Sequence, residues 1–173
     1  MVIREIEDAD RRGVAKIETA FQTEAIFDVV VTPRTMELRE RRQLTPLTKR
    51  YAIADVFAPW STWDTGWVAV DDDRVIGFAG VEYEAWHRRL VLWHLYVQPT
   101  HRRSGVGRKL LEVVEAHGRA RGARRVWLET SNVNVPGIAA YERLGYRLCG
   151  ADHTVYDGLP YQDEVALYFQ KPL

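Results

Sequence analysis

Alternating apolar and polar residues mark a group of strands in the middle of the chain. Residues Trp67 to Val70 and Arg74 to Trp86 favour β-structure, and Asp71 to Asp73 separate the two runs as a hairpin turn. His87 to Arg89 read as a second turn, and Leu90 to Val97 read as a third strand. The pattern therefore predicts an antiparallel meander of three strands.

Beyond this meander the chain alternates between helix and strand. Apolar residues recur at helical spacing after Gly105, and a second helix begins at Pro136, a residue favoured in a first helical turn. Gly122 and Gly145 are suited to end these helices. The expected helices are Gly105–Arg121 and Pro136–Leu144, and the remaining strands are Val2–Glu5, Arg125–Thr130, Tyr146–Ala151 and Glu164–Gln170. This order predicts a mixed α/β domain with one central twisted sheet and helices packed on it.

The region before Trp67 is less regular. A helix is expected from Asp8 or Asp10 to about Phe21, because its apolar residues share one face. Thr35 to Arg42 alternates weakly, which is compatible with a strand. Leu44 to Thr65 shows no period and reads as a long loop, and long loops in compact domains are often binding loops, so it is a candidate substrate lid.

Composition narrows the class of protein. A chain of 173 residues with 46% hydrophobic residues is expected to form a single domain, residues 1–173. Lysine plus arginine number 24 and aspartate plus glutamate 24, so the net charge is zero, which argues against a dedicated nucleic-acid-binding protein. The one cysteine, Cys149, cannot form an internal disulfide and is expected to be a buried strand residue.

Targeting and metal-binding signals are not apparent in the sequence. The five histidines and Cys149 lack the spacing of metal ligands. No apolar run approaches the ~20 residues that span a bilayer, and the N-terminus lacks a basic region followed by an apolar core. We therefore expect a cytoplasmic protein without a metal or a membrane partner.

The strongest chemical signal is the segment Arg102–Gly107, which follows a strand and opens a helix. Its glycines, Gly105 and Gly107, let the backbone turn tightly and approach a ligand. The free N–H groups and the dipole of a helix N-terminus attract anions, so the segment predicts a pyrophosphate cradle. A P-loop does not fit, because the Gly-Lys-Ser/Thr ending is absent, and a Rossmann fingerprint would need three glycines after the first strand.

The flanking residues make this signal more specific. Leu95-Tyr96-Val97-Gln98-Pro99 leads into Arg102-x-x-Gly105-x-Gly107, and Asn134 and Ala140-Tyr141-Glu142-Arg143-Leu144-Gly145-Tyr146 follow downstream. This combination resembles the GNAT superfamily of N-acetyltransferases, over the part of the chain from Trp67 to the C-terminus. The resemblance implies a GNAT-like fold with a splayed central sheet, acetyl-CoA as co-substrate and an amine acceptor. Homodimers are common in the superfamily, so a homodimer is an expectation from the resemblance alone.

The resemblance also implies roles on the cofactor side. The pantetheine arm would pair with the main chain of Leu95, Tyr96 and Val97, as an added strand does. Asn134 would bond the cofactor arm, and Tyr141 would lie near the sulfur. The pyrophosphate would be held by backbone amides, with basic side chains beside them, in the residues Arg102, Arg103, Ser104, Gly105, Val106, Gly107 and Arg108.

Two side chains are candidates for proton transfer. A positioned phenol can donate a proton to the departing thiolate, which predicts Tyr141 as the general acid; packing in the core is the alternative. The attacking amine must lose a proton, and His94 is the leading candidate for the base, directly or through water. Period two places His94 and Tyr96 on one face of their strand and Trp93, Leu95 and Val97 on the other, and in GNAT enzymes the face of His94 looks toward the acceptor. A structural histidine remains the alternative.

Further segments look more narrowly like streptothricin acetyltransferases, among them Phe21–Phe27, Trp86–Leu90 and Trp127–Pro136. This likeness implies acetylation of an amine on the β-lysine arm of streptothricin. A cationic acceptor needs acidic or polar neighbours, for which the candidates are Glu24, Asp28, Glu82, Glu84, Tyr96 and Asp157. The sequence departs from that family in the strand before the phosphate loop, where Trp93, His94 and Tyr96 stand in place of acidic residues, and in the unmatched loop 44–65.

Other readings stay open on the sequence alone. A GNAT enzyme could instead acetylate a protein N-terminus, a lysine or a polyamine. A module that senses acyl-CoA without turnover is a second alternative, although a non-catalytic relic need not keep Tyr141. A nucleic-acid role would rest only on the arginines near residues 102 and 121–125, and zero net charge argues against it.

Overall fold

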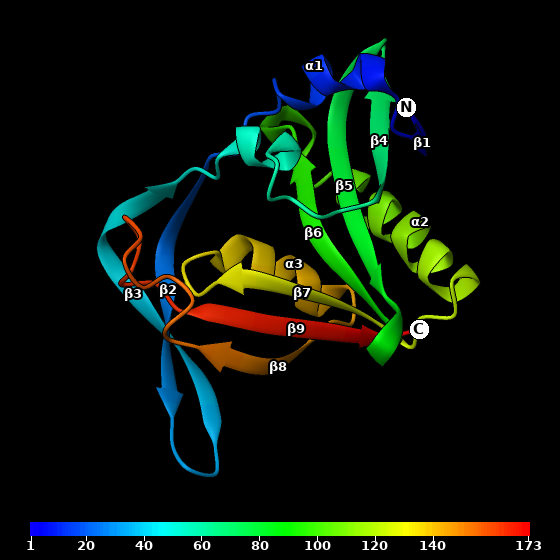
Figure 1. The fold of residues 1–173 in the computed structure, drawn as a ribbon. Helices are drawn as coiled ribbons and strands as arrows, with labels where there is room; N and C mark the ends of the chain where they lie inside the picture. Colours follow the sequence, from blue (N-terminus) through cyan, green and yellow to red (C-terminus); the bar gives the residue numbers. More distant parts are fainter. The chain divides into compact units, whose positions relative to one another are not determined.

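The computed structural model describes all residues from Met1 to Leu173. Contacts within the chain divide it into two units (Figure 1). The first unit comprises residues 1–21, 50–126 and 172–173, and the second comprises residues 22–49 and 127–171. No helix is long and apolar enough to cross a membrane.

The sheet of the first unit has the strand order β1-β4-β5-β6 and is antiparallel. Its strands are β1 (Val2–Glu5), β4 (Thr65–Asp71), β5 (Arg74–Glu84) and β6 (Arg89–Val97). Asp72 and Asp73 both have positive φ, 45° and 58°, which is the backbone of a tight two-residue hairpin turn. The predicted meander and its first turn are therefore confirmed.

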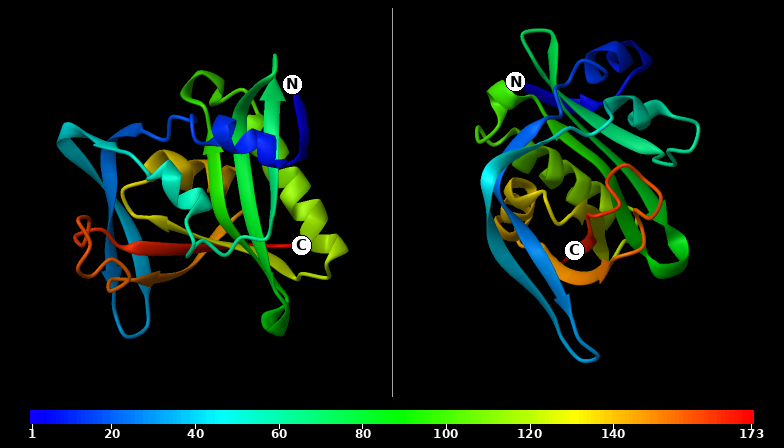
Figure 2. Two further views of the ribbon diagram at one scale, coloured as in Figure 1. Left: turned by 45° about the horizontal axis from the view of Figure 1, so that its top comes forward. Right: turned by 90° about the vertical axis from the view of Figure 1, so that its left-hand side faces the viewer.

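Helix α2 (Val106–Ala120) covers one face of this sheet (Figures 1 and 2). Its buried residues Leu110, Leu111 and Val114 recur at the spacing of one helix face, as the sequence predicts. The approach to β5 is close at Gly77, because a Cβ there would lie 3.0 Å from Leu110 and 3.1 Å from Val106.

The opposite face of the sheet is covered by the N-terminal segment and by the connection before β4. Val14, Ile17 and Val56 pack there against Val68 and Phe78, and all five side chains are buried. We call this the loop face of the sheet, since residues 50–64 lie on it. Apolar burial of this kind is the main stabilising contribution of the first unit.

The expected N-terminal helix to Phe21 is wrong: α1 spans only Arg11–Val14, after a short 3₁₀ helix at Asp8–Asp10. The reason is a tertiary contact. The guanidinium of Arg102 donates hydrogen bonds to the carbonyl oxygens of Glu18 at 3.1 Å and Ala20 at 2.7 Å. The side-chain oxygen of Gln98 accepts a hydrogen bond from the N–H of Glu18 at 2.9 Å. These backbone groups are therefore bonded to the phosphate-loop region instead of to a helix.

The second unit combines three strands, one helix and a long hairpin. Its strands β7 (Arg125–Ser131), β9 (Ala166–Pro172) and β8 (Arg147–Asp152) have the order β7-β9-β8, and α3 (Val135–Arg143) lies beside them (Figure 1). The hairpin consists of β2 (Phe21–Val31) and β3 (Met36–Lys49). Buried Asn132 joins these parts, because its amide donates to Phe27 O at 2.8 Å and accepts from Val165 N at 2.9 Å.

Two expectations in the second unit fail. Leu44 to Lys49 belongs to strand β3 and not to a loop, because β3 pairs with β2 in a two-stranded sheet. Cys149 is exposed and not buried. The pairing of β8 with β9 steps from Leu148–Phe169 to Gly150–Tyr168, so Cys149 is the extra residue of a β-bulge, and a bulge turns its side chain out of the regular alternation. The mixed α/β class and the predicted strands and helices after Trp67 are confirmed.

Candidate active site

The turn before α2 has the backbone of an anion cradle. Arg103 and Gly105 have positive φ, 64° and 90°, and Gly105 caps α2 without any side-chain hydrogen bond. After the N–H of Arg102, which donates to Pro99 O at 3.2 Å, the next N–H bonded within the chain is that of Lys109, which donates to Gly105 O at 3.0 Å. The N–H groups from Arg103 to Arg108 thus lack partners in the protein and carry the partial positive charge of the helix start. Two neighbouring phosphates would satisfy these donors, so the turn fits a pyrophosphate.

The basic residues at this turn differ in what they contact. Arg102 donates to Val97 O at 3.0 Å in addition to the two carbonyls described above, and burial lowers its pKa. Arg108 pairs with Glu112 at 3.2 Å on the exposed surface of α2. Arg102 therefore positions the turn against β6 and the N-terminal segment. Its guanidinium, which was expected to contact a ligand, is hydrogen-bonded to the protein itself.

Strand β6 contains an irregularity beside its predicted catalytic residue. Its pairing with β5 steps from Gly80–His94 to Val81–Leu92, so Trp93 is an extra residue in a β-bulge. Trp93 consequently points to the loop face together with His94, and its indole N–H donates to Glu82 at 2.9 Å. The expectation that Trp93 faces away from His94 is wrong, because it assumed unbroken alternation.

His94 lies in a largely apolar environment on the loop face. Its ring stacks with Tyr96 at 5.8 Å between centroids, and its Nε2 lies 3.1 Å from the hydroxyl of Ser61. Its Nδ1 is buried without a hydrogen-bond partner. The residue is 7% exposed, and burial lowers the pKa of His94 to about 4. The imidazole is therefore neutral at pH 7 and is a weak proton acceptor.

The two acidic residues of β5 are placed differently. Glu84 pairs with Arg89 at 2.7 Å and with His87 at 3.1 Å, so its charge is neutralised within the protein. Glu82 accepts hydrogen bonds from Trp93 and from the hydroxyl of Thr62 at 2.7 Å, and neither donor is a cation. Of the two, Glu82 is the carboxylate with charge available for a ligand.

In the second unit, α3 holds both predicted cofactor residues. Asn134 is the N-cap of α3: its side-chain oxygen accepts from Gly137 N at 3.1 Å and its amide donates to Thr130 at 2.9 Å. Tyr141 lies in the last part of α3, half-buried, with its ring 5.7 Å from that of Tyr146. Asn134 thus has a structural role in starting the helix that carries Tyr141.

The remaining acidic candidates lie on exposed parts of the second unit. Glu24 on β2 and Asp157 in the connection before β9 are exposed. Asp28 is bound by Arg41 through both carboxylate oxygens, at 2.8 and 3.0 Å, so its charge is paired. Nothing in the second unit brings these three residues together in one contact network.

A cluster that sequence reasoning missed lies around β7 in the same unit. Glu129 accepts a hydrogen bond from the hydroxyl of Tyr156, and Glu164 is bonded by both Lys49 and Ser131. The side chain of Glu129 remains accessible, yet the surrounding protein desolvates it, and this raises its pKa despite the opposing hydrogen bond from Tyr156. Alternation along β7 predicts only that Glu129 faces away from the core, so no sequence signal distinguished it from a solvated carboxylate.

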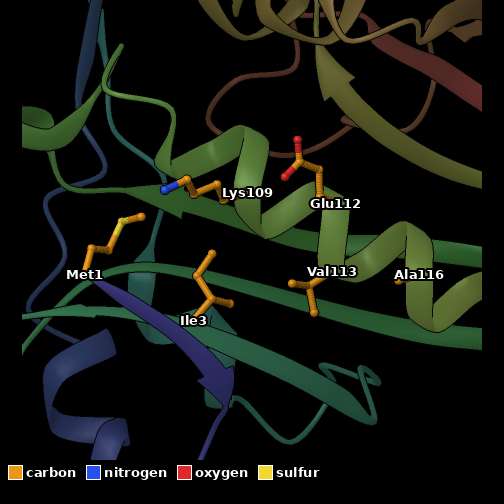
Figure 3. Close-up of a pocket in the computed structure, with 6 residues that line it drawn as sticks. All are labelled: Met1, Ile3, Lys109, Glu112, Val113 and Ala116. Atoms are coloured by element: carbon orange, nitrogen blue, oxygen red, sulfur yellow. The ribbon is translucent and has the colours of Figure 1, made fainter.

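A separate groove of about 410 Å³ lies between β1 and α2 (Figure 3). Its lining is apolar apart from one lysine and one glutamate, and consists of Met1, Ile3, Lys109, Glu112, Val113 and Ala116. None of the predicted site residues lines it. No group of three or more histidine, cysteine or acidic side chains is arranged to hold a metal ion.

Comparison with known proteins assigns the class to which this fold and turn belong. The acetyltransferase (GNAT) family profile matches residues 32–146, and the chain belongs to this family. The protein is therefore an N-acetyltransferase, and acetyl-CoA is its co-substrate.

Three relatives match nearly the whole length of this chain. A streptothricin acetyltransferase of Streptomyces lavendulae is 36% identical over 98% of this chain and 93% of its own length. The crystal structure of a nourseothricin acetyltransferase superposes with a TM-score of 0.89 at 37% identity, covering 99% of this chain and 97% of that one. A Bacillus anthracis protein assigned as a streptothricin acetyltransferase, solved in complex with acetyl coenzyme A, has the same fold, with a TM-score of 0.84 at 24% identity over 99% of both chains.

Proposed function

We propose that this N-acetyltransferase acetylates streptothricin, on an amine of its β-lysine arm, and so inactivates the antibiotic. The observation that carries the proposal is the similarity to a streptothricin acetyltransferase along nearly the whole chain. Acetyl-CoA is a metabolite of the cell interior, so the enzyme would act in the cytoplasm. A homodimer remains an expectation of the same proposal.

The turn before α2 would hold the pyrophosphate of acetyl-CoA. Its unbonded N–H groups from Arg103 to Arg108 would donate to phosphate oxygens, and the main chain of Leu95 to Val97 would pair with the pantetheine arm. The role of Arg102 is then to fix the turn to the end of β6 by its hydrogen bond to Val97. Gly107 keeps the start of the helix open to the phosphates.

The reaction requires two proton transfers. The neutral amine attacks the thioester carbonyl, the carbon–sulfur bond breaks, and the acceptor nitrogen gives up a proton. A phenol has a reference pKa of about 10, so it is protonated at neutral pH, and that value is close enough to the thiol's reference pKa of about 8.5 for a positioned phenol to give its proton to the departing thiolate. We assign this role to Tyr141, which α3 presents with its ring half-buried.

Two residues compete for the role of base. His94 is poorly matched to it, because its pKa of about 4 makes it a much weaker base than an amine and its Nε2 is already bonded to Ser61. Glu129 is accessible, and desolvation raises the pKa of its carboxyl group, which strengthens it as a proton acceptor. We therefore propose Glu129 as the base, and we propose that His94 has a structural role in the packing of the loop face.

Thiol release from acetyl-CoA against a panel of amines tests the function. The panel contains streptothricin, a polyamine, lysine and a peptide with a free N-terminus. Turnover with streptothricin at a kcat/KM well above that of the other amines is the expected result, and mass spectrometry of the product should place the acetyl group on the β-lysine arm.

Other outcomes would redirect the proposal. Turnover only with lysine, a polyamine or the peptide would keep the enzyme class and replace the acceptor. Binding of acetyl-CoA without thiol release from any amine would favour a sensor of acyl-CoA over an antibiotic-modifying enzyme.

A further inference from the structure

The bulge in β6 creates a small polar and aromatic surface on the loop face. Trp93 and His94 are consecutive, yet both point to this face, because the extra residue shifts the pairing with β5. The indole N–H of Trp93 donates to Glu82 and the hydroxyl of Thr62 donates to the same carboxylate oxygen, Oε2. Strand β5 therefore contributes Glu82, strand β6 contributes Trp93, and the connection before β4 contributes Thr62.

The carboxylate of Glu82 is not neutralised by the protein. Both of its hydrogen bonds reach Oε2, and Oε1 has no hydrogen-bond partner. Glu84, two residues further along β5, shows the contrast, because Arg89 and His87 pair with it. Glu82 thus carries a negative charge whose direct partners are two neutral donors.

Trp93 is unusual for a residue in the middle of a strand. It is 41% exposed, while its neighbours Leu92 and His94 are 5% and 7% exposed. Its hydrogen bond to Glu82 fixes the orientation of the indole, so an aromatic face is held open to solvent beside a carboxylate. Aromatic faces attract alkylammonium groups, and tryptophan does so most strongly.

We propose that Trp93 and Glu82 form a subsite for an alkylammonium group of the acceptor. The ammonium lies over the indole and is bonded by the free Oε1 of Glu82. It is not the reacting nitrogen, which must be neutral to attack the thioester, so the acceptor carries a second amino group that stays protonated. This inference rests on the proposed function and deepens it, since it requires an acceptor with at least two amino groups.

Steady-state kinetics of four variants test the subsite. Trp93→Leu removes the aromatic face, Trp93→Phe keeps a face but loses the hydrogen bond to Glu82, and Glu82→Gln removes the charge but keeps an acceptor for Trp93 and Thr62. Trp86→Leu is the matched control, because Trp86 is 84% exposed at the β5–β6 turn.

A subsite predicts that KM for streptothricin rises about tenfold in Trp93→Leu and in Glu82→Gln, and less in Trp93→Phe. The KM for acetyl-CoA and the thermal midpoint serve as checks that each variant is folded, and Trp86→Leu should match the wild type in all three quantities. Raising the ionic strength should increase KM for the wild type more than for Glu82→Gln, because screening acts on the charge that the variant lacks.

The two hypotheses fail in different ways. If the wild type acetylates streptothricin and its KM is unchanged in Trp93→Leu and Glu82→Gln, the subsite is refuted and the proposed function stands. If the wild type acetylates another amine of the panel instead, the same variants are measured with that amine. An acceptor that carries no second cationic group, or variants that leave its KM unchanged, then overturns the subsite.

Discussion

His94 should make the stability of the protein depend on pH, and His94→Gln should remove the part of that dependence that His94 contributes. In the folded protein burial lowers the pKa of His94 to about 4, from an ordinary value of 6.5 in the unfolded chain. As the pH falls below the pKa of His94 in the unfolded chain, the unfolded chain binds a proton at this residue and the native state does not, so protonation favours unfolding. Stability from the neutral histidine is therefore complete at neutral pH and is lost progressively as the pH falls toward 4.

The magnitude follows from the two pKa values. Each unit of difference corresponds to about 1.4 kcal/mol, so the whole effect is roughly 3 kcal/mol and about 2 kcal/mol of it falls between pH 7.5 and pH 5. This is a large fraction of the ~5–15 kcal/mol stability of an ordinary domain. Other titratable groups, among them Glu129 with its raised pKa, are present in both the wild type and His94→Gln and cancel when the two proteins are compared.

Urea unfolding followed by tryptophan fluorescence at several pH values measures the effect. The wild type should lose about 2 kcal/mol more between pH 7.5 and pH 5 than His94→Gln loses. Burial also lowers the pKa of His117, but that residue is present in both proteins and cancels in the comparison. Parallel loss of stability in the two proteins would refute the reasoning, because it would mean that His94 titrates alike in the folded and unfolded states.

The remaining predictions concern the reaction. Gly107→Ala should leave the free energy of unfolding within about 1 kcal/mol, because the new Cβ meets Val97 at an ordinary 3.7 Å, while Gly107→Trp should abolish acetyl-CoA binding in calorimetry; normal binding by the tryptophan variant would remove this turn from the cofactor site. Tyr141→Phe should lower kcat by about 10²–10⁴ with little change in acetyl-CoA affinity, and unchanged turnover would exclude Tyr141 as the acid. Glu129→Gln should lower kcat by about 10²-fold or more and flatten the acidic limb of the pH–rate profile, whereas an unaltered profile would return the role of base to another group.

Much of the fold after Trp67 could be predicted because local chemistry specifies it. The turn at Asp72 and Asp73 needs two residues that tolerate positive φ, and the helix ends at Gly122 and Gly145 need the same freedom, with φ of 75° and 89°. The turn before α2 was predictable for a similar reason, since Gly105 adopts a φ of 90° at the helix start. At these places the residue type and the backbone conformation are linked within a few positions.

The region before Trp67 was not predictable, because distant residues decide its conformation. The carbonyls of Glu18 and Ala20 bind a guanidinium more than 80 positions away, that of Arg102, and this contact competes with the helix that the apolar period favours. Strand β3 depends in the same way on its partner β2 and on the ion pair between Lys49 and Glu164. Local propensity is a weak prior wherever such long-range bonds are available.

The acceptor side shows how a single extra residue can change a functional interpretation. Unbroken alternation along β6 separates Trp93 from His94 and leaves His94 as the evident catalytic group. The bulge places both on the loop face, where burial makes His94 a weak base and the hydrogen bond to Glu82 holds Trp93 open beside a charged carboxylate. Aromatic residues in β6 therefore need not exclude a cationic acceptor, since the negative charge is supplied by β5 and the indole adds a face that favours ammonium groups.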